Sequence, residues 1–193
     1  MPLGAFKSAL FGASADLSSA MLLSTATASD DASIEFTLPT AYKQVKFGFY
    51  NINPAADDVR FRFQVNATGN TLFGETITSA TFNAYHREND TGTPTVAYAD
   101  WLDQAQGTSY QDITDSVGPG SDESCAGELH LFNPSSAYVK HFYSRSNAVN
   151  YSGPYTIDHF SSGYINTTSA IDEISFKMSS GNFDGTIKMY GVG

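Results

Sequence analysis

From residue 34 onward, apolar side chains recur at every second position of the sequence. The segment from Val59 to Val65 is the clearest case, because its large apolar residues alternate with arginine and glutamine. A period of two places alternate side chains on opposite faces of a β-strand. The same alternation occurs in residues 34–38 and 45–49. These segments predict strands that bury one face in a hydrophobic core.

Further strands are expected along the rest of the chain. They cover residues 72–78, 81–86, 128–132, 138–143 and 155–160. Turn-forming Gly, Pro and Asn residues separate them. Many short strands without a sustained helical pattern predict an all-β protein, and we expect a jelly-roll-like antiparallel β-sandwich.

The C-terminal residues contain two alternating segments around a turn. Ile171–Phe176 and Gly185–Gly191 flank the turn Ser179–Asn182, in which glycine and asparagine tolerate positive φ angles. We expect the two segments to pair as a hairpin that closes the domain.

One long region, residues 100–119, shows no alternation. We expect it to be a loop that crosses between the two sheets, with a helical turn over residues 101–105.

The first 30 residues differ from the rest in their high content of Ala, Ser, Leu and Thr. We expect an extended N-terminal arm over residues 1–30 and a sandwich domain over residues 31–193. Apolar side chains of the arm are candidates for anchoring contacts with a neighbouring subunit. They are Phe6, Leu10, Phe11, Leu17 and Met21. No apolar run in the arm is long enough for a signal peptide or a membrane span.

The overall charge limits the partners of the chain. Its formal net charge is −10, which repels phosphate backbones and anionic lipid headgroups. Nucleic acid is therefore not an expected partner. Cys125 is the single cysteine, so the core and not an internal disulfide must hold the fold together.

Three segments carry a resemblance to a known family. Phe47–Phe63, Gly127–Pro134 and Ile171–Gly191 resemble the β-sandwich domains of tailed-phage virion proteins. The resemblance implies a non-enzymatic structural protein of the virion that self-associates, as a homotrimer, and contacts the major capsid protein. A compact domain with a short arm favours capsid decoration, or cement. The alternative is a tail fibre or spike domain that binds a receptor, including a glycan of the host surface.

Several residues are candidates for catalysis or metal binding. Cys125 and His130 could form a nucleophile and its base, but no positive group nearby lowers the pKa of the thiol. The four histidines lack the spacing of zinc ligands, and the paired acids near Asp30, Asp57 and Asp112 lack a calcium-loop pattern. We expect no catalytic residue, metal ion or cofactor.

The aromatic residues Tyr98, Trp101 and Tyr110 fall in or beside the region without alternation. Exposed rings there could stack on the face of a sugar, and packing in the core or at an interface is the alternative.

Overall fold

The computed structural model describes residues 20–153 and 155–193, which form twelve β-strands. The strands are β1 (Met21–Asp31), β2 (Ile34–Thr37), β3 (Gln44–Pro54), β4 (Phe61–Ala67), β5 (Ile77–Arg87), β6 (Thr95–Tyr98), β7 (Gln111–Asp112), β8 (Cys125–Phe132), β9 (Lys140–Val149), β10 (Tyr155–Ile165), β11 (Ile171–Met178) and β12 (Phe183–Val192).

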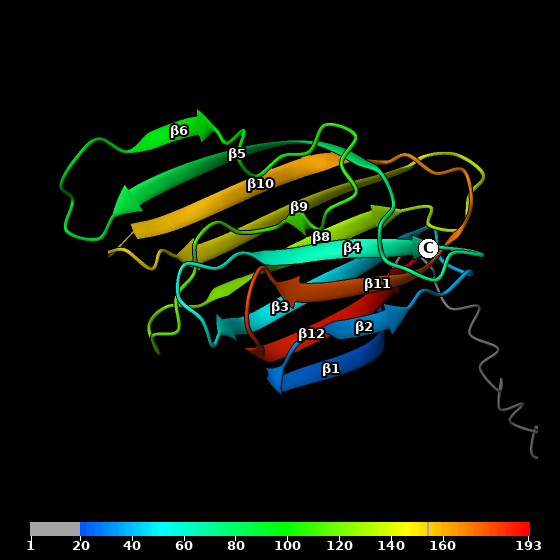
Figure 1. Ribbon diagram of the computed structural model, residues 1–193, viewed down its shortest axis with the longest axis horizontal. Coiled ribbons are helices and arrows are strands. Elements are labelled where there is room, and N and C mark those ends of the chain that lie inside the picture. Colours follow the sequence, from blue (N-terminus) through cyan, green and yellow to red (C-terminus); the bar gives the residue numbers. More distant parts are fainter. Residues whose placement is uncertain (1–19, 154) are drawn as a thin grey trace, which may run out of the picture.

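The strands form two antiparallel sheets, as expected for a sandwich. One sheet has eight strands in the order β1-β12-β3-β8-β9-β10-β5-β6, and the other has four in the order β2-β11-β4-β7. In Figure 1 the four-stranded sheet lies in front of one half of the larger sheet. The all-β sandwich is therefore confirmed.

The pairing of strands is nested along the chain. β1 pairs with β12, β2 with β11, β3 with β8, and β4 with β7. A long ribbon of paired strands that is rolled into two sheets has this order, which is that of a jelly roll. Two hairpins are inserted into it, β5-β6 and β9-β10, and they extend the eight-stranded sheet beyond the sandwich (Figure 1).

The core lies between the two sheets, and Phe176 of β11 is at its centre. Its ring contacts four other phenylalanine rings, with centroid distances of 5.1 Å to Phe47, 5.3 Å to Phe49, 5.9 Å to Phe61 and 6.3 Å to Phe36. Aromatic pairs at these distances add to the stabilisation from buried apolar area.

The expected C-terminal hairpin is wrong, although both of its strands are present. β11 belongs to the four-stranded sheet and β12 to the eight-stranded sheet, so the turn between them crosses from one sheet to the other. Phe176 and Ile187 therefore meet in the core from opposite sides. The segment Phe47–Phe63 is a second connection of this kind, because β3 and β4 also lie in different sheets.

Two strand assignments also differ from the structure. Residues 72–76 are a loop with an exposed Leu72, and β5 runs without interruption from Ile77 to Arg87. The apolar residues of this loop resemble the alternation of a strand, but the loop pairs with no described strand. The strand β6 was not expected at all.

Residues 100–119 cross between the sheets as expected, but they also contain the short, unexpected strand β7, which pairs with β4. We call them the covering loop. No helical turn forms at residues 101–105. The loop lies over the inner face of the inserted hairpins, which is the face continuous with the core. Ser146 Oγ donates to the carbonyl of Ile113 at 2.8 Å, and Ser79 Oγ donates to Gln111 Oε1 at 2.7 Å. The covering loop thus supplies hydrogen-bond acceptors to serines on this face, which allows these serines to be buried.

The structure also places residues 21–30 differently from the expected arm. They form most of β1, which pairs with β12 along its length and packs Leu23, Ala26 and Ala28 against the core. The inward-facing residues of β1 are mostly alanine, so the alternation of apolar and polar residues is weak in its sequence.

Candidate functional site

The hollow beside Trp101 is the candidate site. It lies where the inner face of β5, β6 and β10 emerges from beneath the covering loop, and its volume is about 400 Å³. It is lined by Asn83, Tyr85, Ala97, Trp101, Asp115, Asn150, Ser152, Tyr155 and Ile157. We call it the Trp101 hollow. Its residues come from two inserted hairpins and one loop, so only the folded chain brings them together.

The indole of Trp101 is held in place by the covering loop itself. Its Nε1 donates to Asp115 Oδ2 at 2.9 Å. Asp115 is fixed in turn, because its Oδ1 accepts from the backbone N–H of Ser116 at 3.0 Å and lies 3.6 Å from Arg60 Nε. The ring is nevertheless 49% exposed, so it presents a rigid apolar surface to solvent.

His159 lies beneath the hollow and joins the loop to the sheet. Its Nε2 accepts a hydrogen bond from the backbone N–H of Asp115 at 3.0 Å, which assigns the ring proton to Nδ1. Burial lowers the pKa of His159 to about 4, because the charged imidazolium loses its hydration. The imidazole is neutral at pH 7, and its buried Nδ1 has no hydrogen-bond partner in the described part of the chain.

Two amides supply polar groups to the hollow. Asn83 is 4% exposed, and the small accessible part of it lines the hollow. Asn150 Oδ1 accepts from the backbone N–H of Ser152 at 3.0 Å and from its hydroxyl at 2.8 Å. The backbone N–H of Asn150 donates to the carbonyl of Tyr155 at 3.1 Å, and these bonds hold Asn150 in the turn that lines the hollow.

Two tyrosines complete the walls. The rings of Tyr85 and Tyr155 meet edge to face with a centroid distance of 6.1 Å. The guanidinium of Arg87 lies 4.7 Å from the centroid of the Tyr155 ring. These contacts stabilise the positions of both rings.

Of the three aromatic residues that the sequence singled out, only Trp101 lines this hollow. Tyr98 projects to the opposite face of β6 from Ala97, and its hydroxyl donates to Asp103. Tyr110 lies against the four-stranded sheet, where its hydroxyl donates to Ser175 Oγ at 3.2 Å and Lys177 Nζ lies 4.1 Å above its ring. The three rings therefore form no common surface.

Asn83, Tyr85 and Tyr155 also line the hollow, although the sequence pattern did not predict them as site residues. Tyr85 was placed in an expected strand, and alternation with buried Thr81 and Asn83 could have shown its inward face. Tyr155 reaches the hollow because β10 pairs with β5, which places Tyr155 opposite Arg87 and near Tyr85. Nothing in the local sequence around Tyr155 predicts this pairing.

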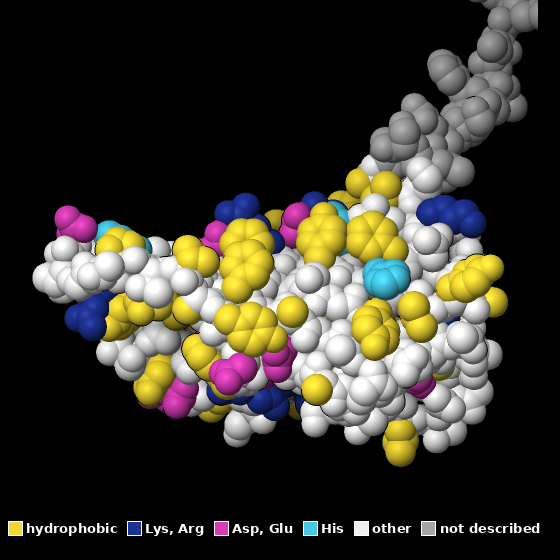
Figure 2. All heavy atoms as spheres, turned by 90° about the horizontal axis from the view of Figure 1, so that it is seen from above, with side chains coloured by type: hydrophobic (Ala, Val, Ile, Leu, Met, Phe, Trp, Pro, Cys, Tyr) yellow, Lys and Arg dark blue, Asp and Glu magenta, His cyan; other side chains and the backbone are white. Residues whose placement is uncertain are grey.

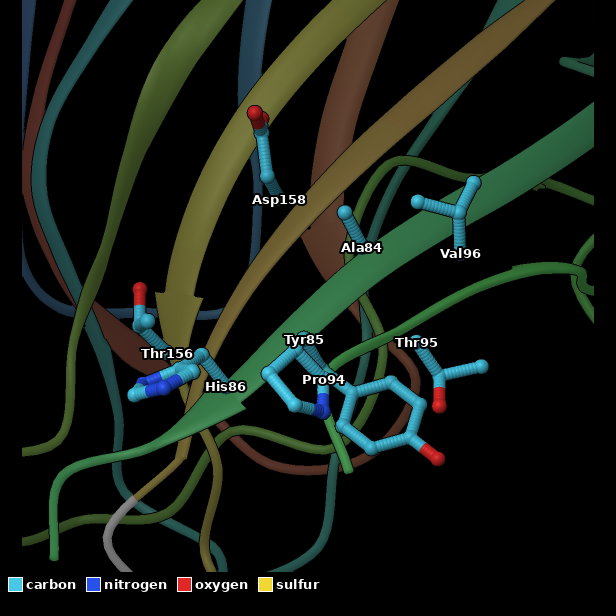
Figure 3. A pocket seen from close by; sticks show the side chains of 8 residues that line it. All are labelled: Ala84, Tyr85, His86, Pro94, Thr95, Val96, Thr156 and Asp158. Carbon is cyan, nitrogen blue, oxygen red and sulfur yellow. The ribbon is translucent and has the colours of Figure 1, made fainter. Parts of the chain in front are cut away.

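A second hollow of about 360 Å³ lies on the outer face of the inserted hairpins. Figure 3 shows Ala84, Val96 and Asp158 on one side of the sheet, and the Tyr85 ring beside Pro94 and Thr95. Asp158 accepts from Arg145 Nε at 3.1 Å and Nη2 at 2.7 Å, so its carboxylate is already engaged. The second hollow therefore offers few free polar groups to a ligand.

Over the face of the molecule in Figure 2, exposed hydrophobic side chains lie in separate groups among polar atoms.

The structure separates the residues weighed for catalysis. Cys125 faces the core, where burial raises the pKa of its thiol to about 12, and His130 faces outward on the same strand. His130 lies instead beside Glu128, with 3.1 Å between Nε2 and Oε1. Among the described residues, no three His, Cys, Asp or Glu side chains cluster in a way that could hold a metal ion.

Only Met21 of the expected anchoring residues lies within the described chain. Phe6, Leu10, Phe11 and Leu17 lie outside the described residues. Met21 is 44% exposed, and its sulfur accepts a hydrogen bond from the hydroxyl of Tyr42 at 3.4 Å. It begins β1, the outermost strand of the eight-stranded sheet.

Comparison with known protein families finds no family model that matches the chain, and no curated protein is significantly similar to it. In the described residues, no helix has the length and apolar character needed to cross a membrane.

Proposed function

We propose that this chain is a non-enzymatic structural protein of the phage virion, displayed on the particle surface as a capsid decoration protein. The sequence resemblance to tailed-phage virion proteins supports this role. The nested jelly-roll order is consistent with it, since viral capsid domains use this architecture. The fold alone does not assign a function, so the proposal also needs a surface through which the chain could assemble.

The observation that carries the proposal is the outer edge of β1, which pairs with no other described strand. From Met21 to Ser29 the strand contains no charged residue and no proline. Such an edge presents unpaired backbone groups that can pair with a strand of another chain. The other edge strands, β6, β2 and β7, have only four, four and two residues. Proteins commonly protect long edges with charge, so an unprotected one favours assembly.

The residues expected to anchor the chain immediately precede this edge in sequence. Strand addition at β1 would bring Phe6, Leu10, Phe11 and Leu17 to the same neighbour, the major capsid protein or a second copy. In a homotrimer each copy would offer its β1 edge to a strand of the next copy, and the ring would close after three contacts.

The test is the incorporation of an edge variant into particles. Thr25→Glu adds a charge to β1 opposite Lys188, so the fold should tolerate it while pairing with a further strand becomes unfavourable. Ser162→Glu is the matched control, because Ser162 is exposed on β10, a strand that is paired on both sides. Purified protein is mixed with particles that lack it, and bound protein is measured after sedimentation.

We expect the Thr25→Glu variant to lose most binding and the Ser162→Glu variant to bind as the wild type does. Equal binding by all three proteins would overturn the role of the edge. A map of intact particles without this jelly roll on the head would overturn the decoration role.

A tail fibre or spike domain that binds a receptor is the second candidate role. The observation that favours it is the exposed, rigid indole of Trp101 at the mouth of a hollow. Density on the tail, in the same particle map, would support this role.

A further inference from the structure

We propose that the Trp101 hollow binds a single neutral sugar unit of a glycan. This inference deepens the second candidate role by naming its ligand class, and it does not depend on assembly through β1. The chain could therefore decorate the capsid as proposed without binding a sugar. It could equally bind a sugar without decorating the capsid.

The first argument is the aromatic wall. Trp101, Tyr85 and Tyr155 all line one hollow, and none of the three rings is free to turn without losing a contact. The apolar C–H face of a sugar ring packs against such rings. Because the rings are held before binding, little conformational entropy is lost when the ligand enters.

The second argument is the amide of Asn83, which supplies the hollow with polar groups. Asn83 is 4% exposed, and it reaches solvent at the hollow that it lines. Its amide lines the hollow, so a group entering there would meet both a donor and an acceptor. Adjacent sugar hydroxyls are donors and acceptors at once. Asn150 adds further N–H donors at the opposite hairpin.

The third argument concerns charge. Among the residues that the structure describes, Asp115 is the only charged one that lines the hollow, and it is held by Trp101, Ser116 and Arg60. No cationic side chain of residues 20–153 or 155–193 lines the hollow to pair with a carboxylate or phosphate, so an acidic sugar would meet the carboxylate of Asp115 without a cation of its own. The lining therefore selects a neutral sugar over an anionic one.

The volume is consistent with this ligand. Small-molecule sites commonly enclose roughly 300 to 1,000 Å³, and the hollow measures about 400 Å³. It is open along one side, so the rest of a glycan chain can extend into solvent.

Trp101 makes the test direct, because it is the single tryptophan of the chain. The wild-type protein is titrated with the methyl glycosides of glucose, galactose, mannose and N-acetylglucosamine, and with N-acetylneuraminic acid as the anionic comparison. We expect saturable changes in tryptophan fluorescence with at least one neutral glycoside and none with the anionic sugar.

Variants then locate the binding, measured by saturation-transfer NMR, which needs no tryptophan signal. We expect Asn83→Ala to weaken binding about tenfold and Trp101→Ala to abolish it. Tyr98→Ala is the matched control, since it removes an exposed ring from the opposite face, and it should bind as the wild type does. Thermal unfolding of each variant confirms that it is folded, and Trp101→Phe provides a milder change if the alanine variant is not.

Three results would overturn the proposal. The first is the absence of saturable binding for every neutral glycoside, and the second is binding of the anionic sugar alone. The third is unchanged binding in folded Asn83 and Trp101 variants, which would place the sugar elsewhere.

Discussion

The imidazole of His159 accepts a hydrogen bond from the backbone N–H of Asp115, with 3.0 Å between the two nitrogen atoms. This bond joins β10 to the covering loop beneath the Trp101 hollow. Only an unprotonated Nε2 can accept it, so the contact exists while the imidazole is neutral. The position of the loop is therefore linked to the protonation of one buried side chain.

We predict that acid weakens the fold through His159. Its pKa in the folded protein is lowered to about 4, below the ordinary 6.5, because burial disfavours the charged ring. The stabilisation is complete above pH 6.5 and is lost as the pH falls from 6.5 to 4, since only the unfolded chain takes up the proton readily in that range. The loss amounts to about 3 kcal/mol.

Urea unfolding at a series of pH values measures this effect. The His159→Gln variant should lose less stability than the wild type between pH 6.5 and 4, because it has no proton to bind. His141→Gln, at an exposed histidine of β9, should follow the wild-type curve. Identical pH dependence in the wild type and the His159→Gln variant would contradict the prediction.

A second prediction concerns the centre of the core. Phe176→Ala should lower the free energy of unfolding by about 3 to 5 kcal/mol, because it leaves a cavity among four phenylalanine rings. Lys177→Ala, at the adjacent residue, removes only the contact with the Tyr110 ring and should cost less than about 1 kcal/mol. Chemical denaturation of both variants is the measurement. Equal costs would mean that the side of β11 assigned to the core is wrong.

Two truncations separate the arm from β1. Removal of residues 1–19 should leave a cooperative thermal transition close to that of the full chain, because the two sheets retain every described strand. Removal of residues 1–31 deletes β1, exposes β12 and takes Ala28 from the core, so it should lower the transition temperature markedly. Calorimetry of both proteins tests this division, and equal transitions would show that β1 contributes nothing to stability.

A fourth prediction concerns the close approach of β8 and β9. A Cβ atom on Gly127 would lie 2.6 Å from Ser146 Cα, so Gly127→Ala must displace the backbone of β9. We expect it to cost about 1 to 3 kcal/mol of stability. Gly74→Ala is the control, since a Cβ there would have no neighbour within 4 Å, and it should be neutral or slightly stabilising. Thermal melts compare the two, and a neutral Gly127→Ala would mean that the strands are further apart.

Much of the fold could be predicted from alternation. The residues of β4 that the pattern assigned to the core, Phe61, Phe63 and Val65, are all fully buried. Gln64 is buried as well, contrary to its expected polar face, because the covering loop lies over it. Its Nε2 donates to the carbonyls of Thr108 and Ser109 at 3.1 and 2.9 Å. The loop contacts residues far away in sequence, so periodicity within one strand could not reveal it.

The candidate site was predictable only in part. Trp101 was singled out because an aromatic residue in a region without alternation can be exposed. Asn83 and Tyr155 had no such signal, because each lies in an ordinary strand and becomes part of the site through the pairing of β5 with β10.

The sequence by itself determined most of the long strands and the side chains of β2, β3 and β4 that face the core, because alternate residues of a strand lie on one face. It did not reveal β1, β6 or β7, whose alternation is weak or whose length is short. Only the tertiary structure decided which strands are neighbours. Ile174 and Ile187 show the same alternation whether their strands pair in one sheet or face each other from two, since both arrangements bury the same side chains. The two arrangements differ in which backbone groups are hydrogen-bonded to each other. Every residue type has nearly the same backbone groups, so the alternation of side chains does not predict that pairing.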